Sequence, residues 1–167
     1  TANDLDLLTE GTITASIDTD ETVETLKTLT GTTHEYTIVI AAGDAETSTA
    51  ADLNTINGKT TGTIDASAIT VLASDTITNI QTLLTAGNDT DQFTANSFSS
   101  LDDVAIADAT IDVSDFNAPV TQANTATGQT TRANNATLFT LSNATAFNGG
   151  TASDFATLLT SETNGLI

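Results

Sequence analysis

The stretch AADLNTINGKTTGTIDASAITVLASDTITNIQTLL, residues 50–84, sets the expectation for the whole fold. Residues 52–56 place Asp, Leu and Ile at the spacing of a short amphipathic helix. Residues 63–70 are rich in threonine and alternate polar with apolar side chains, which predicts a half-buried strand. Residues 77–84 carry Ile or Leu at every third or fourth position. With Asp75 just ahead of them, they predict a second helix.

Related sequences precede and follow this stretch. ANDL, AADL, LDDV and ASDF begin at residues 2, 50, 101 and 152. Each contains an aspartate followed by an apolar residue, as an N-cap is at the start of a helix. These aspartates are Asp4, Asp52, Asp103 and Asp154, spaced by 48, 51 and 51 residues (52 − 4, 103 − 52, 154 − 103). The spacing predicts repeat units over 1–49 and 50–100, a degenerate unit over 101–151, and the start of a fourth over 152–167.

The other elements of each unit follow from the same comparison. The helical spacing of residues 77–83 occurs also at residues 23–29. Residues 117–136 have one large aliphatic side chain and a proline, so we expect mostly loop there. Strands are expected at 11–17, 35–40, 62–69, 92–98, 109–116 and 138–141. The predicted fold is an α/β repeat array with short Thr-rich strands and short helices. A β-solenoid or other all-β repeat is the alternative.

Charge restricts the partners of this chain. It has 22 acidic and three basic residues, a formal net charge of −19. Nucleic acids and anionic membrane surfaces would repel it, whereas salty water or divalent cations would suit its exterior. Cysteine is absent, which excludes disulfides and thiolate metal sites. No apolar run approaches the roughly 20 residues of a membrane span.

The sequence offers little for catalysis. The single histidine, His34, stands at the start of an expected strand, where we predict a surface position beside Glu35. Pairs of carboxylates occur, but the chain has no tryptophan and one tyrosine to form the aromatic platforms usual in sugar-cleaving sites. We therefore expect no enzyme activity and assign no catalytic residue.

Two acidic segments are candidates for calcium. Hard cations take oxygen ligands from carboxylates, amide side chains and turn carbonyls. The candidate ligands are Asp18, Asp20, Asn88, Asp89 and Asp91. Neither segment has the spacing of an EF-hand or of the calcium-binding nonapeptide repeat. Solvated acidic turns that cap helices are the alternative.

The aligned units resemble tandem repeats of large extracellular bacterial proteins, including surface-layer and adhesin-like proteins of cyanobacterial type. The residues that carry the resemblance are 51–53, 61–67 and 77–84, in the pattern A-D-L, T-G-T-I-D-A-S and I-x-x-I-x-x-L-L. The resemblance implies an extracellular structural subunit of a layer, filament or adhesin that acts by self-association. A calcium- or cell-surface-glycan-binding module is the alternative, and an ice-binding protein, suggested by the Thr-rich strands, is a lesser one.

Overall fold

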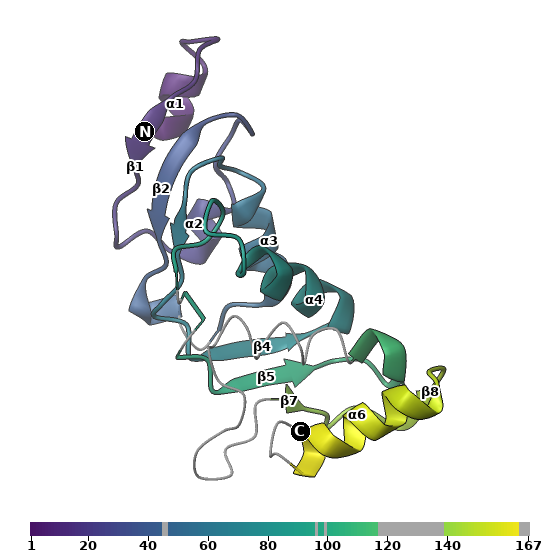
Figure 1. Cartoon of the computed structure of the whole chain (residues 1–167). Helices are drawn as coiled ribbons and strands as arrows, with labels where there is room; N and C mark the ends of the chain where they lie inside the picture. Colours follow the sequence, from purple (N-terminus) through teal and green to yellow (C-terminus); the bar gives the residue numbers. More distant parts are fainter. Residues whose placement is uncertain (45–46, 96, 99, 117–138, 164–167) are drawn as a thin grey trace.

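The computed structural model describes residues 1–44, 47–95, 97–98, 100–116 and 139–163 and shows a mixed α/β chain of short helices and strands (Figure 1). The helices are α1 (Ala2–Asp6), α2 (Val23–Leu26), α3 (Ala50–Asn57), α4 (Ile77–Ala86) and α6 (Ala152–Thr163), with a 3-10 turn, η1 (Ala42–Asp44). The strands are β1 (Thr14–Ser16), β2 (Glu35–Val39), β3 (Ile64–Asp65), β4 (Val71–Asp75), β5 (Asp103–Ile106), β6 (Thr110–Asp112), β7 (Phe139–Thr140) and β8 (Ala146–Asn148).

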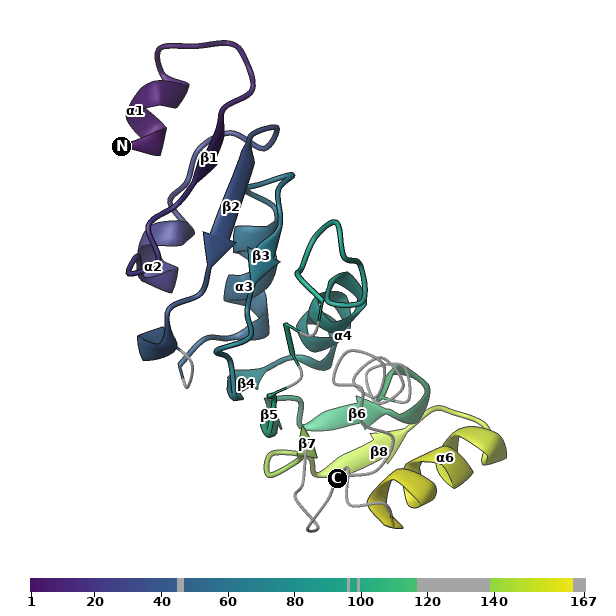
Figure 2. The same ribbon diagram turned by 60° about the vertical axis from the view of Figure 1, so that its left-hand side comes forward.

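The strands form small open sheets in which every described pairing is parallel. The orders are β1-β2-β3, β4-β5-β7 and β6-β8. Thr14 pairs with Glu35, and Ile38 with Ile64, so the chain returns to the sheet after 21 and 26 residues (35 − 14, 64 − 38). A parallel return requires a crossover, and α2 and α3 supply it between β1, β2 and β3 (Figure 2).

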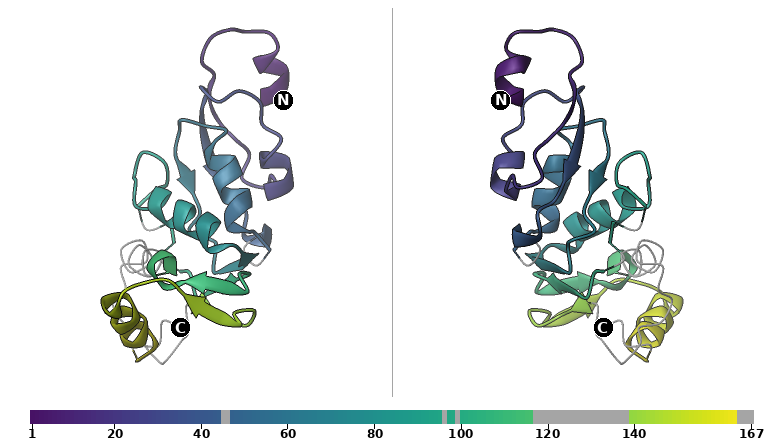
Figure 3. Two further views of the ribbon diagram at one scale, coloured as in Figure 1. Left: turned by 90° about the vertical axis from the view of Figure 1, so that its right-hand side faces the viewer. Right: turned by 90° about the vertical axis from the view of Figure 1, so that its left-hand side faces the viewer.

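Helices α2, α3 and α4 share one sequence phase. Their N-caps, Thr22, Thr49 and Thr76, lie 27 residues apart (49 − 22, 76 − 49). The first, fourth and seventh residues after each N-cap are buried and apolar, although the seventh, Leu29, lies beyond the end of α2. They are Val23, Leu26 and Leu29, then Ala50, Leu53 and Ile56, then Ile77, Ile80 and Leu83. This three-residue spacing gives each helix one apolar stripe, and these side chains form a continuous core with those of the strands. The helices follow one another along one side of the strands (Figure 3).

A buried hydroxyl fastens β2 to the segment that follows α3. Thr60 Oγ1 accepts hydrogen bonds from the N–H groups of Tyr36 and Gly62, at 2.8 and 2.9 Å, and donates to the carbonyl of Tyr36 at 2.8 Å. At Gly62 a Cβ would lie 2.5 Å from the Tyr36 carbonyl oxygen, so the two backbone segments approach too closely for a side chain.

The helices expected at 52–56 and 77–84 are confirmed, as is the strand at 35–40, whereas the helix expected at 23–29 is confirmed only over Val23–Leu26. The Thr-rich strand is much shorter than predicted, because the chain turns after Asp65 and a strand that the sequence did not predict, β4, follows. The strand at 92–98 is wrong: its described residues form turns, and Phe93 alone bridges to Ile64. The all-β alternative is wrong because α3, α4 and α6 are helical, and residues 117–136 lie outside the described part.

The repeated aspartates do not cap helices as predicted. Thr1 and Thr49 are the N-caps, and their hydroxyls accept from the N–H groups of Asp4 and Asp52 at 3.3 and 3.1 Å. The aspartate therefore lies in the first turn, where the helix dipole favours a carboxylate. Asp103 lies in strand β5 instead. The 51-residue unit boundaries stay a prediction. The paired strands β1 and β2 are only 21 residues apart in the sequence (35 − 14), which is less than half of that length.

Candidate functional site

The two ends of the molecule carry the exposed large hydrophobic side chains of the described chain. Leu5, Leu7 and Leu8 lie in or directly after α1, at the N-terminal end. Phe147 on β8 and Phe155 and Leu159 on α6 lie at the opposite end (Figure 1). Between these ends the large apolar side chains form one buried core. Exposed apolar groups confined to two opposite faces indicate interaction surfaces.

These exposed residues occupy helix positions that are buried elsewhere in the chain. The fourth residue after the N-cap threonine is Leu26 in α2, Leu53 in α3 and Ile80 in α4, each at most 1% exposed. The same position is Leu5 in α1 and Phe155 in α6, which are 53% and 41% exposed. Helices α1 and α6 thus present the core position of this helix type to solvent.

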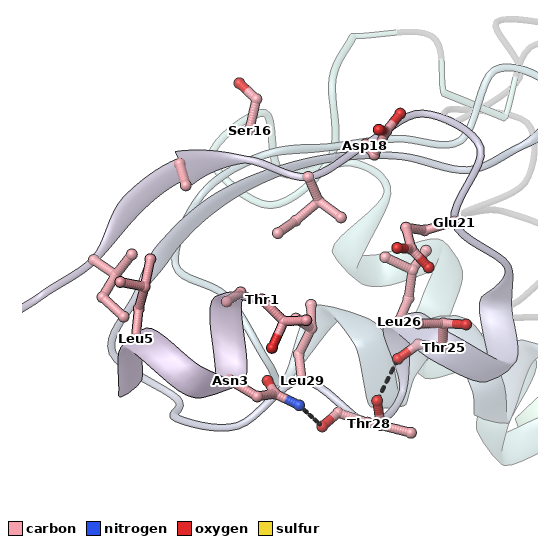
Figure 4. Close-up of a pocket in the computed structure, with 14 residues that line it drawn as sticks. Thr1, Asn3, Leu5, Ser16, Asp18, Glu21, Thr25, Leu26, Thr28 and Leu29 are labelled. Atoms are coloured by element: carbon pink, nitrogen blue, oxygen red, sulfur yellow. Dashed lines mark hydrogen bonds between the residues drawn. The ribbon is translucent and has the colours of Figure 1, made fainter. Parts of the chain in front are cut away.

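A pocket of about 390 Å³ lies between α1, β1 and α2 at the N-terminal end (Figure 4). Apolar side chains of β1 and α2 and of the residues that flank them form its floor, and Asp18 and Glu21 lie at one side of it. Its apolar lining residues are Ala2, Leu5, Ile13, Ala15, Ile17, Leu26 and Leu29. The pocket is therefore an opening into the core.

The pocket exists because α1 is out of register with the other helices. Lys27, five residues after its N-cap, contacts Asp52, three residues after the next N-cap, at 2.7 Å. Asn54 Nδ2 donates to the carbonyl of Asn79 at the same two positions, at 2.9 Å. Asn3 of α1 instead donates to the carbonyl of Thr28, beyond the end of α2, at 3.0 Å. The space beside the first turn of α2 is consequently left unfilled.

Carboxylates from the following segment cap the helices of the interior. Asp44 Oδ2 accepts from the Val23 N–H of α2 at 3.0 Å. Asp75 accepts likewise from Ala51 of α3 at 2.6 Å, and Asp108 from Ile77 of α4 at 2.7 Å. Each bond satisfies a helix N–H that has no partner within the helix, and it places negative charge at the positive end of the dipole.

His34 is buried, not on the surface as the sequence predicted. Its Nδ1 accepts a hydrogen bond from the Ile13 N–H at 3.1 Å, so its proton is on Nε2, which lies 2.7 Å from Asp6 Oδ1. The hydrogen bonds from His34 and Thr30 hold the pKa of the Asp6 carboxyl below its usual value. Asp6 thereby ties α1 to the start of β2. No sequence pattern separates this pairing from a surface histidine, because the partners are 28 residues apart.

Acid should release α1 through this pair. Since the folded pKa of Asp6 is lower than its unfolded value of about 3.9, the carboxylate stabilises the fold fully above that value and loses its effect as pH falls below it. Urea unfolding followed by circular dichroism should show Asp6→Asn to be less stable than wild type at pH 6, with the difference shrinking below about pH 4. A difference that stays constant down to pH 2.5 or so would show that Asp6 does not act through its charge.

The predicted calcium ligands lie in two separate turns. Asp18 and Asp20 follow β1, where the Glu21 N–H donates to the carbonyl of Asp18. In the other turn Asp89 uses its carboxylate internally, accepting from the Asp91 N–H at 3.0 Å and from Gln92 Nε2 at 2.8 Å. These two bonds lower the pKa of Asp89, with that from Gln92 contributing most. Among the described residues no group of three or more His, Asp or Glu side chains gathers at one point. A calcium site at Asn88 and its neighbours stays a prediction.

Comparison with protein-family models, curated proteins and solved structures finds no match for this chain. In the described part, no helix has the length and apolar character needed to cross a bilayer. The two apolar ends are therefore the features on which a function can be argued.

Proposed function

We propose that the protein is a structural subunit of an extracellular bacterial assembly, a layer, filament or adhesin, and that its copies associate end to end. The observation that carries this proposal is the exposure of Leu5 and Phe155 at a helix position that is otherwise buried. A neighbour seated on each end would bury both. The placement outside the cell rests on the resemblance of the repeats.

The strands at the two ends support association in one direction. β1 is the outer strand of its sheet, and β8 is the outer strand of the sheet that it forms with β6. Each described strand pair is parallel, so a second copy that continues the pattern would join one end to the other. Such a head-to-tail contact leaves both ends of the pair open for further copies, and it produces a fibre unless the ring closes.

Stacking of this kind would also stabilise the short parallel strands. A two-stranded sheet such as β6-β8 is marginally stable at best when it stands alone. The packing of α2 on α3 and of α3 on α4 supports the repeat array that we propose for the whole chain. End-to-end association would extend this arrangement from one copy to the next.

Salt should strengthen the association. Each copy carries a net charge of −19, so neighbouring copies repel at low ionic strength. Raising sodium chloride from about 10 mM to about 300 mM shortens the screening length and should tighten association at least about tenfold. Sedimentation velocity over a range of protein concentrations measures this, and larger species should grow in with concentration and salt.

A protein that stays monomeric at high concentration in both salts would contradict the proposed function and favour a binding module. Chelation of divalent cations at constant ionic strength separates screening from calcium bridging. If Asp18, Asp20 or Asp89 binds calcium at a junction, chelation should reduce the association, and readdition of calcium should restore it. Screening alone would leave it unchanged.

A further inference from the structure

We propose that α6 of one copy docks beside α2 of the next, in the pocket that α1 leaves unfilled. This inference rests on the proposed function and specifies its junction. The occupant is a second copy of this chain, because Thr151 and the first residues of α6 read TASDF, which is close to TANDL at residues 1–5 and TAADL at 49–53. The helix that the pocket lacks is thus present at the other end of the same chain.

The register of the interior helices fixes how α6 would lie. Among α2, α3 and α4, the fifth residue after one N-cap contacts the third residue after the next N-cap, as Lys27 contacts Asp52. In α6, Thr151 accepts a hydrogen bond from the Asp154 N–H, as an N-cap threonine does, so the fifth residue after it is Ala156. The third residue after the N-cap of α2 is Thr25, which would be the partner of Ala156. Phe155 would then take the place that Leu26 and Leu53 hold in their own helices, against the apolar floor of the pocket (Figure 4).

The polar groups at the two ends complement each other as well. Among the described residues, the side chains of Asp18 and Glu21 beside the pocket accept no hydrogen bond, whereas Asp44, Asp75 and Asp108 each cap the helix that precedes them. The first N–H groups of a helix have no intrahelical partner. A docked α6 would bring those N–H groups to Asp18 or Glu21 and repeat the interior capping bond across the junction.

The docked α6 must displace helix α1 from its position. α6 has 12 residues and a rise of about 1.5 Å per residue, so a helix that starts beside the first turn of α2 would extend over the site of α1. α1 has five residues and is held by Asn3 and Asp6. Weakening its attachment should therefore favour the junction.

The first test is cross-linking between two single-cysteine chains. Because the chain has no native cysteine, the cross-linker can react only with the introduced thiols. Ala156→Cys and Thr25→Cys chains are mixed under assembling conditions with a short thiol-reactive cross-linker. We expect a cross-linked pair to form in the mixture. The control pair, Ser153→Cys with Thr28→Cys, reproduces the register of α1 and should give little product. A reversed preference would overturn the proposed register.

The second test is the association strength of three variants, measured by sedimentation. Phe155→Ala should weaken association about 30-fold, as loss of a buried aromatic anchor does. Thr82→Ala removes an exposed side chain from α4, away from both ends, and should have no effect. Asn3→Ala, which removes one of the two attachments of α1, should strengthen association. Weaker association of Asn3→Ala, or an unchanged Phe155→Ala, would overturn the docked α6. Absence of wild-type assembly would instead overturn the proposed function itself.

Discussion

Replacing Thr60 by valine should lower the free energy of unfolding by about 3 kcal/mol, at about 1 kcal/mol for each lost hydrogen bond. The hydroxyl makes three short bonds, two accepted from Tyr36 and Gly62 and one donated to Tyr36. Valine has nearly the same shape, so packing is retained while the buried backbone groups lose their partner. Urea unfolding of the dilute protein, followed by circular dichroism, should show a lower midpoint with an unchanged slope.

Tyr36→Phe is the matched control for this loss. The Tyr36 hydroxyl is buried and has no hydrogen-bond partner among the described residues, and burial, with a smaller contribution from Asp6, raises its pKa. Removing it should leave stability unchanged or raise it by up to about 1 kcal/mol. If both variants lose the same stability, the hydroxyl of Thr60 has no special role.

Asp75→Ala should cost about 2 kcal/mol, the second largest effect we expect within the fold. Its Oδ2 caps α3 through Ala51 at 2.6 Å, and its Oδ1 accepts from the Thr76 N–H and from Asn79 Nδ2, both at 2.7 Å. One side chain therefore organises the first turns of two successive helices. Urea unfolding gives the change in free energy, and far-ultraviolet circular dichroism should show a loss of helix before the main transition.

Asp91→Ala controls for the removal of one negative charge from a strongly acidic chain. The Asp91 side chain is exposed and accepts no hydrogen bond in the described part, so its loss should be neutral or slightly stabilising. Asp75→Asn keeps an oxygen acceptor without the charge and should cost less than the alanine variant. Equal effects of Asp75→Ala and Asp91→Ala would contradict the capping role.

The helices were predictable because their signal is local. Ile77, Ile80 and Leu83 define an apolar stripe by spacing alone, and the structure buries all three. The strands were less predictable because strands of two to five residues carry too few alternating positions to fix their limits. β4 in particular reads VLASD, and its pairing with β5 some 32 residues later (103 − 71) leaves no mark in the local sequence.

The candidate site was predictable only in part. The likeness between the opening and closing segments was evident in the sequence, and it led to the expected end-to-end association. The 27-residue spacing of the helices is carried by their N-cap threonines, Thr22, Thr49 and Thr76. The repeated aspartates have a different spacing and therefore do not reveal it. The pairing of Asp6 with His34, and the carboxylate caps from Asp44 and Asp108, join residues 21 to 31 positions apart and emerge only when the chain is folded.

Small-angle X-ray scattering over a concentration series at moderate salt tests the central claim most directly. End-to-end association predicts that the maximum dimension of the particles grows with concentration while the cross-sectional radius stays that of one copy. Growth of the cross-section would indicate side-by-side association, and a maximum dimension that stays at the single-copy value at every concentration would contradict self-assembly.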